Sequence, residues 1–221
     1  STSSSQLPYF LNTTTSPSVE KFIFPVTLEP LFDSKTASAF SAFVLHAKAN
    51  RNSKIAFEKD IFDFPKISIS YEELGELIGT NLEMADYEFV KFKSKPKEGW
   101  SFLNEVLICG KISKKFRESV EKGKIIGEEV NECRTLSNTP GGTMTPSLLA
   151  REAEKVAKDY KDVKVRVLSR KQIAELGMGG VLGVSQGSSE EPKFIIMEYS
   201  KGKKKENPVV LVGKGVTFDT G

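Results

Sequence analysis

Short apolar runs alternate with longer segments of helical periodicity along this chain of 221 residues. The runs "EVLICG" (105–110), "VKVRVL" (163–168) and "KFIIMEYS" (193–200) have the composition of strands. Between them, apolar residues recur every three or four positions, as they do in helices that pack on a sheet. The alternation predicts an α/β fold: an N-terminal α/β portion, then a second α/β domain with a largely parallel sheet.

Helices are predicted where capping signals precede an apolar stripe. Ser70 and Glu73 have the spacing of a capping box, and Thr145 followed by Pro146 marks another helix start. A further helix is predicted around residues 40–47, and a long one over residues 113–137. The stripes expected to face the core are Phe40, Phe43, Val44 and Ala47; Leu74, Leu77, Ile78, Leu82 and Ala85; Phe116, Val120, Ile126, Val130 and Cys133; and Leu149, Ala153, Val156, Ala157 and Tyr160.

Four parts are predicted along the chain. Residues 1–18 are rich in hydroxyl side chains and indicate a flexible tail, with a transit-peptide remnant as the less favoured alternative. Residues 19–112 form an N-terminal α/β domain in which "FIFPVTL", from Phe22, is an edge strand. The helix over 113–137 links this domain to a second one, which begins in residues 138–221.

Composition excludes some classes of function. The chain is 38% apolar and 28% charged and has no apolar run long enough to cross a bilayer, so a membrane protein is not expected. Its net charge of +3 depends on four lysines within "KGKKKEN" (201–207), a solvated loop by its pattern, which makes nucleic-acid binding unlikely. Two cysteines far apart, Cys109 and Cys133, are expected to be buried thiols in a cytoplasmic, reducing compartment.

Few side chains suggest catalysis by themselves. His46, the only histidine, lies on a predicted helix, which leaves Ser185, Ser188 and Ser189 without a base for a nucleophilic triad. Asp86, Glu190 and Glu191 are possible paired carboxylates, although acidic residues in loops are more often simply solvated.

The stretch "PVVLVGKGVTFDTG" (208–221) places an apolar strand before a glycine-flanked lysine. It does not match a P-loop, because Gly215 follows Lys214 where Ser or Thr should bind magnesium. It does not match a dinucleotide fingerprint either, because Phe218 occupies the third glycine position. A metal site at the carboxyl end of the strand remains, with Lys214 and Asp219 as candidate ligands, against the alternative of a solvated lysine and a turn aspartate.

Four stretches in order resemble the leucyl aminopeptidase (cytosol aminopeptidase) family. They are "ADYEFVKFKSK" (85–95), "RTLSNTPGGTMTP" (134–146), "ELGMGGVLGVSQGSSEEPKFIIMEY" (175–199) and "LVGKGVTFDTG" (211–221). The resemblance covers about residues 70–221 and implies a metalloaminopeptidase that removes N-terminal residues, leucine among them, by two-metal hydrolysis. It implies Lys214 as a ligand of one metal and Asp219 as the bridging ligand of two divalent ions (zinc, manganese or magnesium). It also implies peptides with a free N-terminus as substrates and a hexameric homo-oligomer as the assembly.

The same resemblance implies that the remaining ligands follow the last stretch. We therefore expect this chain to be an N-terminal fragment that contains only the beginning of the second α/β domain, incomplete at the C-terminus. It is expected to be inactive alone and to contain no complete catalytic set. The alternative is a non-catalytic family relative that acts as an assembly or binding subunit.

Overall fold

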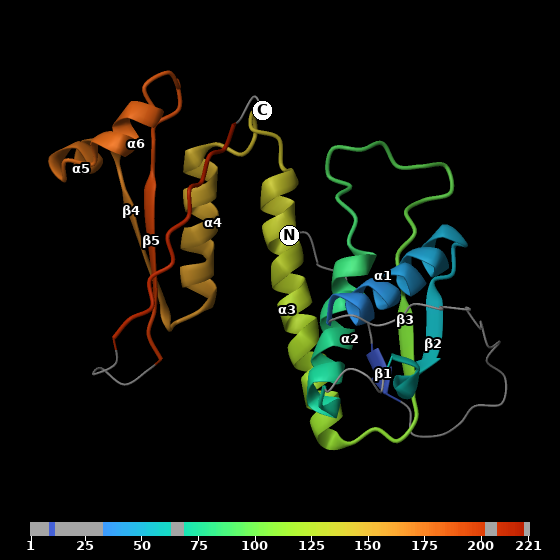
Figure 1. Cartoon of the computed structure of the whole chain (residues 1–221). Helices are drawn as coiled ribbons and strands as arrows, with labels where there is room; N and C mark the ends of the chain where they lie inside the picture. The colour runs from blue at the N-terminus through green and yellow to red at the C-terminus, as the bar shows by residue number, and fades with distance from the viewer. Residues whose placement is uncertain (1–8, 12–32, 63–68, 202–206, 219–221) are drawn as a thin grey trace. The chain divides into compact units, whose positions relative to one another are not determined.

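The structure is a computed structural model that describes residues 9–11, 33–62, 69–201 and 207–218. The chain divides into two compact units, Ser1–Thr135 and Leu136–Gly221, whose elements are labelled in Figure 1. The domain boundaries predicted at residues 18, 112 and 137 remain predictions.

The first unit contains a sheet of three parallel strands in the order β1–β3–β2. Its strands are β1 (Tyr9–Leu11), β2 (Lys54–Glu58) and β3 (Glu105–Cys109), with Ile55 paired to Val106. The strand expected over 105–110 is therefore confirmed, and so is the α/β class with a parallel sheet. β1 lies inside the segment expected to be a flexible tail, so the structure differs there; the expected strand at Phe22 falls outside the described residues.

Helices α1 (Asp33–Ala49), α2 (Tyr71–Asp86) and α3 (Lys114–Asn138) complete this unit, with the short 3-10 helix η1 (Lys59–Phe62). The capping box at the start of α2 is confirmed. The Glu73 N–H donates to Ser70 Oγ at 3.2 Å, and the Ser70 N–H donates to Glu73 Oε2 at 2.7 Å. The buried core joins helices and sheet: Phe40, Val44, Ala47, Ile55, Phe57, Leu74, Ile78, Leu82, Leu103, Val106, Ile108, Phe116 and Val120.

Glycines let the backbones of α2 and α3 touch. A Cβ on Gly123 would lie 2.0 Å from the carbonyl oxygen of Glu76, and one on Gly79 would lie 2.2 Å from that of Val120. Gly75 and Gly127 complete a pair of glycines four residues apart on each helix, and both are buried. At this separation the hydroxyl of Thr80 donates to the Gly123 carbonyl across the two helices at 3.1 Å.

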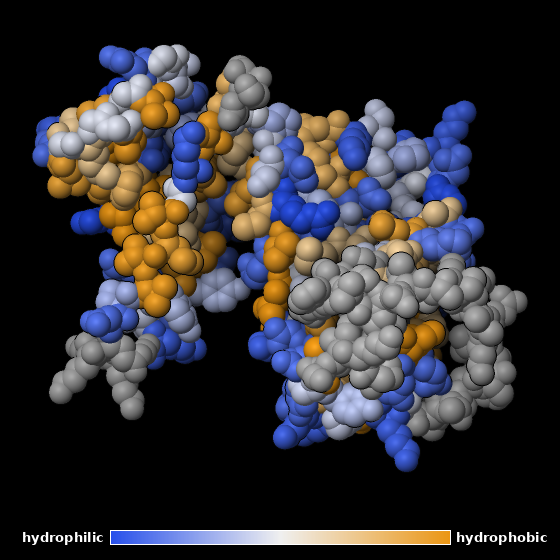
Figure 2. Space-filling model, in the orientation of Figure 1, coloured by the Kyte–Doolittle hydropathy of each residue, from blue (hydrophilic) through white to orange (hydrophobic). Residues whose placement is uncertain are grey.

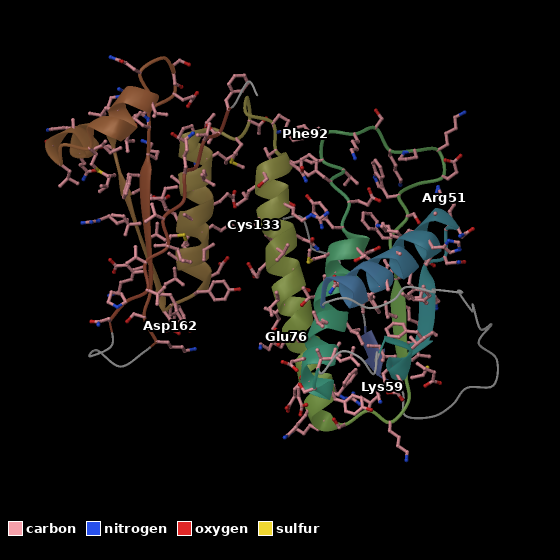
Figure 3. All side chains as sticks on the ribbon, viewed as in Figure 1. Arg51, Lys59, Glu76, Phe92, Cys133 and Asp162 are labelled. Carbon is pink, nitrogen blue, oxygen red and sulfur yellow. The ribbon has the colours of Figure 1, made fainter. Side chains whose placement is uncertain are left out.

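The predicted core stripe of α3 is wrong at its C-terminal end. Phe116 and Val120 are buried as expected, but the buried row continues through Gly123 and Gly127, and Cys133 is exposed (Figure 3). Five turns of 3.6 residues separate Phe116 from position 134, so Arg134, not Cys133, continues that face. Arg134 accordingly donates to the Met84 carbonyl at 2.8 Å.

The second unit contains α4 (Pro146–Asp159), β4 (Val163–Leu168), α5 (Arg170–Glu175), α6 (Gly179–Val184) and β5 (Phe194–Tyr199). Its two described strands pair antiparallel, so the largely parallel sheet predicted for this domain is not what they form. The two short helices α5 and α6 lie between these strands, and β5 runs back along β4 with Val163 paired to Tyr199 and Leu168 to Phe194.

The apolar run at 208–212 forms no strand, although a buried strand was expected. Val209, Val210, Leu211 and Val212 are 74–92% exposed, and Figure 2 shows apolar side chains gathered over this part of the second unit. A strand requires a neighbour to satisfy its backbone groups. No strand in the described part of the chain pairs with this run, which explains the difference.

Candidate functional site

The structure describes only one of the two predicted metal ligands. Lys214 is exposed and lies between Gly213 and Gly215, in a segment (207–218) without helix or strand. Asp219 lies outside the described residues. Within the residues that the structure describes, no three His, Cys, Asp or Glu side chains lie close enough together to hold a metal ion. The described residues therefore do not form a metal site by themselves, and both assignments stay predictions.

The segment around Lys214 packs against a loop that is distant in sequence. A Cβ on Gly141 would lie 2.7 Å from the carbonyl oxygen of Thr217 and 2.9 Å from the ring of Phe218. At Gly215 the added Cβ would lie 3.5 Å from Leu149 on α4. The structure thus brings together two of the four stretches that carry the family resemblance, and it explains why a glycine is needed at position 141.

That loop (139–145) is held by its own backbone. The Pro140 carbonyl accepts from the N–H groups of Thr143 and Met144, both at 2.8 Å. Thr145 then caps α4 by accepting the Leu148 N–H at 3.3 Å, with Pro146 in the first turn, as predicted. Because Met144 is buried and Thr145 caps α4, the C-terminal end of the loop is held in place.

The acidic residues considered as paired carboxylates do not pair. Glu191 accepts the Arg170 N–H at 3.1 Å and forms an ion pair with Lys193. The hydrogen bond from Lys193, followed by that from Arg170, lowers the pKa of the Glu191 carboxyl. Glu190 is exposed, and its own backbone N–H donates to Ser188 Oγ. Both residues hold a surface loop and show no arrangement for acid–base catalysis.

Asp86 lies in a buried polar cluster of the first unit. Its carboxylate is 3.3 Å from Lys48 Nζ and accepts the Leu103 N–H at 3.0 Å, while Lys48 also donates to the Asp86 carbonyl at 2.7 Å. Burial raises the pKa of the Asp86 carboxyl, against the lowering effects of the Leu103 N–H and of Lys48. The cluster ties the ends of α1 and α2 to the chain that enters β3, which is a structural role.

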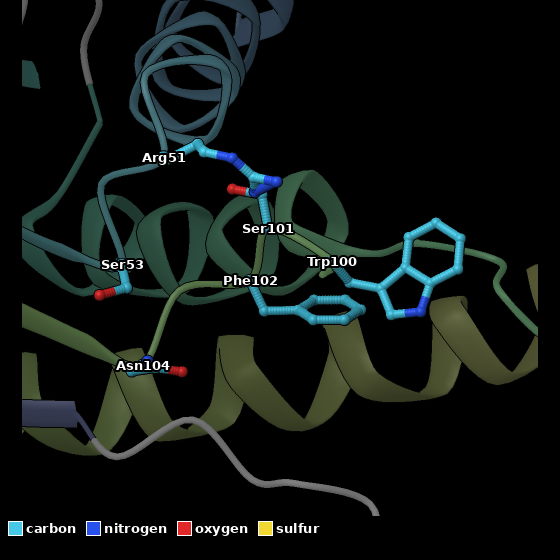
Figure 4. Close-up of a pocket in the computed structure, with 6 residues that line it drawn as sticks. All are labelled: Arg51, Ser53, Trp100, Ser101, Phe102 and Asn104. Atoms are coloured by element: carbon cyan, nitrogen blue, oxygen red, sulfur yellow. The ribbon is translucent and has the colours of Figure 1, made fainter. Parts of the chain in front are cut away.

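A shallow hollow in the first unit was not foreseen from the sequence. It measures about 180 Å³ and is lined by Arg51, Ser53, Trp100, Ser101, Phe102 and Asn104 (Figure 4). These residues come from the turn after α1 and from the approach to β3, so only tertiary structure assembles them. Neither an acidic residue nor a histidine is among them, so the lining provides no general base.

Comparison with known proteins agrees with the motifs. The family model of the cytosol aminopeptidase family, catalytic domain, matches residues 131–221. A probable cytosol aminopeptidase of Alkalilimnicola ehrlichii is 37% identical over 166 residues, which are 72% of this chain and 33% of that protein. A solved structure of a tomato leucine aminopeptidase mutant matches 85% of this chain and 38% of its own, with 28% identity and a TM-score of 0.74.

Over these residues the chain is similar to the cytosol aminopeptidases. The resemblance seen in the four motifs is thereby confirmed. A second solved structure, the bottromycin maturation enzyme BotP in complex with Mn, is 20% identical with a TM-score of 0.59 over 74% of this chain and 33% of its own, and shows the fold alone. The chain spans about a third of the length of these relatives. In its described part, no helix is both long and apolar enough to cross a membrane.

Proposed function

We propose that the complete protein is a metal-dependent aminopeptidase that removes N-terminal residues, leucine-type residues preferentially, from peptides. The match of residues 131–221 to an aminopeptidase catalytic domain carries this proposal. The names of the relatives extend it to a cytoplasmic enzyme. A hexameric homo-oligomer is the assembly we propose on the family resemblance.

Two divalent metal ions, zinc, manganese or magnesium, are the proposed cofactors. The Mn-bound BotP structure supports a divalent ion in this fold. Such a pair supplies a Lewis acid for the scissile carbonyl and lowers the pKa of a bound water. Lys214 and Asp219 would hold them, Lys214 as the neutral amine, because an ammonium group has no lone pair to donate. Lys214 suits this role in being exposed and in forming no ion pair within the described part of the chain.

The 221 residues alone are proposed to be inactive. One amine and one carboxylate leave a shell of about four ligands per ion incomplete. The described residues offer no further cluster of His, Cys, Asp or Glu to complete it. The packing of Thr217 and Phe218 on Gly141, and of Gly215 near Leu149 of α4, would position half of the site, and further ligands would come from chain beyond these residues.

The test uses the full-length protein made with Zn²⁺ or Mn²⁺, compared with its Lys214→Ala and Asp219→Asn variants. We expect release of leucine from a peptide with a free N-terminus but not from the N-acetylated peptide. Each variant should lose at least about a hundredfold in kcat/KM. Metal content measured by mass spectrometry should fall below about two ions per chain. Lys201→Ala is the matched control, since Lys201 is exposed and forms an ion pair with Asp162.

A full-length protein without hydrolytic activity towards any free N-terminus, whatever metal is supplied, would overturn the proposal. It would favour the non-catalytic binding or assembly subunit. Activity in the 221-residue chain would overturn the proposed dependence on further ligands while leaving the reaction class intact.

A further inference from the structure

The segment between α2 and β3 (residues 87–104) carries an uncompensated row of lysines. Lys91, Lys93, Lys95 and Lys97 alternate along it and are all exposed. Of these, Lys91 lies over the ring of Phe92 at 5.6 Å, and none forms an ion pair within the described part of the chain. Figure 1 shows the segment as a loop that projects from the first unit, and Figure 3 labels Phe92 on it.

The base of this lysine loop is firmly anchored. Ser101 Oγ donates to the Lys48 carbonyl at 2.9 Å, and the Asn104 N–H donates to the Ser53 carbonyl at 2.6 Å. The buried Asp86 carboxylate accepts the Leu103 N–H. Nearer the tip, a turn closes with the Gly99 N–H donating to the Pro96 carbonyl at 2.9 Å, where Gly99 has a φ of 80° that favours glycine. The lysines therefore extend from a base that the fold holds in place.

The hollow described above begins where the lysines end. Trp100 and Phe102 line it, and Phe102 is 36% exposed. Arg51 stands beside them, donating to the Gly99 carbonyl at 3.3 Å and lying 3.8 Å from Glu98. Aromatic walls with a few hydroxyl and amide groups at the rim suit one apolar side chain of an extended partner.

We propose that the lysine loop and this hollow dock an acidic polypeptide segment of a partner protein, with one apolar or aromatic side chain seated against Trp100 and Phe102. Charge complementarity carries the choice of partner, because these lysine ammonium groups form no ion pair with a carboxylate among the described residues.

Nucleic acid fits the same surface less well. The lysines form a single row, not a broad basic face, and the carboxylates of Glu88 and Glu98 bound that row on both sides. A phosphate backbone carries a charge at every nucleotide and would pass close to them. An acidic polypeptide can place its carboxylates opposite the lysines alone.

Trp100 makes the proposal directly measurable, because it is the only tryptophan of the chain. The probe is a blocked peptide, acetyl-Glu-Glu-Phe-Glu-Glu-amide, which has neither a free N-terminus nor a tryptophan. Titrated into the 221-residue chain, it should change Trp100 fluorescence saturably, and the affinity should fall with added salt. The lysine counterpart of the peptide, and the acidic peptide with glycine in place of phenylalanine, should bind at least about fivefold more weakly.

Charge reversal tests the lysines themselves. Lys93→Glu with Lys95→Glu should weaken binding of the acidic peptide at least about fivefold. The matched control, Lys111→Glu with Lys161→Glu, changes the net charge equally at exposed lysines elsewhere and should leave the affinity unchanged. Unaltered far-UV circular dichroism would show that both variants fold.

Three results would overturn the proposal. They are no saturable response to the acidic peptide, equal loss of affinity in the two double variants, and tighter binding of single-stranded oligothymidylate than of the acidic peptide. The last would assign the loop to nucleic acid instead. None of these readouts depends on catalysis, so they are independent of the proposed aminopeptidase activity.

Discussion

The two units of this chain bury their apolar side chains to very different extents. Every residue of the hydrophobic core cluster lies in the first unit, on α1, α2, α3 and the parallel sheet, except Leu103, which lies just before β3. In the second unit the buried apolar residues are few: Met144, Ala150, Leu168 and Ile173. There the most apolar run, Val209–Val212, is almost fully exposed.

The two units differ in whether their helices and strands have neighbouring elements to pack against. In the first unit each helix stripe and each strand has a neighbour, so that Leu82 of α2 is 0% exposed. In the second unit β4 and β5 pair only with each other among the described strands, and residues 208–212 pair with none. An apolar surface is buried only where a second surface packs against it. This chain spans about a third of the length of its relatives.

The largest effect on stability is expected from a comparison of two leucines, one buried in the first unit and one exposed in the second. Leu82→Ala removes a fully buried side chain and should lower the free energy of unfolding by about 3 to 4 kcal/mol, through lost burial and a residual cavity. Leu211→Ala changes a side chain that is 92% exposed and should change it by less than about 0.5 kcal/mol. Urea unfolding followed by circular dichroism measures both. A loss of comparable size for Leu211→Ala would show that residues 208–212 are buried in solution.

A smaller loss is expected at the contact between α2 and α3. Alanine normally favours a helix over glycine. Gly123→Ala should nevertheless destabilise by about 2 to 3 kcal/mol, because its Cβ would lie 2.0 Å from the Glu76 carbonyl oxygen and force the helices apart. Gly180→Ala on α6, with nothing within 4 Å of the added Cβ, is the matched control and should not destabilise. If both variants unfold at the same urea concentration as the parent chain, the close approach of the two helices is wrong.

Local signals predicted much of the first unit from sequence. The capping box at Ser70 and the strand at 105–110 depend on residues close together in the chain, and both are confirmed. The glycine contact was missed, because a helix stripe is normally recognised by apolar side chains. Gly123 and Gly127 have none, so Cys133 was wrongly placed on the buried face. At these positions α3 packs closely on α2 because glycine has no side chain.

The second unit was less predictable for a physical reason. The apolar composition of residues 208–212 indicates a strand. A strand forms only beside a neighbouring strand, however, and the composition of the run does not reveal whether a neighbour is present. The antiparallel pairing of β4 and β5 is likewise not set locally, because the connection from Leu168 to Phe194 is long enough for either strand direction. For the candidate site, the sequence motifs predict Lys214 and Asp219 as ligands, and these assignments stay predictions. The contact of Gly141 with residues 217–218 appears only in three dimensions.

The smallest effects can decide whether the two units unfold independently. Ser70→Ala and Ser169→Ala each remove the side-chain oxygen of a capping box, one in each unit, and each should cost about 1 kcal/mol. Trp100 lies in the first unit and reports on that unit alone, while far-UV circular dichroism reports on both. Ser70→Ala should therefore lower the urea midpoint seen by Trp100 fluorescence. Ser169→Ala should leave that midpoint unchanged and shift only part of the circular dichroism signal. Equal shifts of the Trp100 midpoint in both variants would mean that the two units unfold as one cooperative body, and the contrast in burial between them would then not be a contrast in stability.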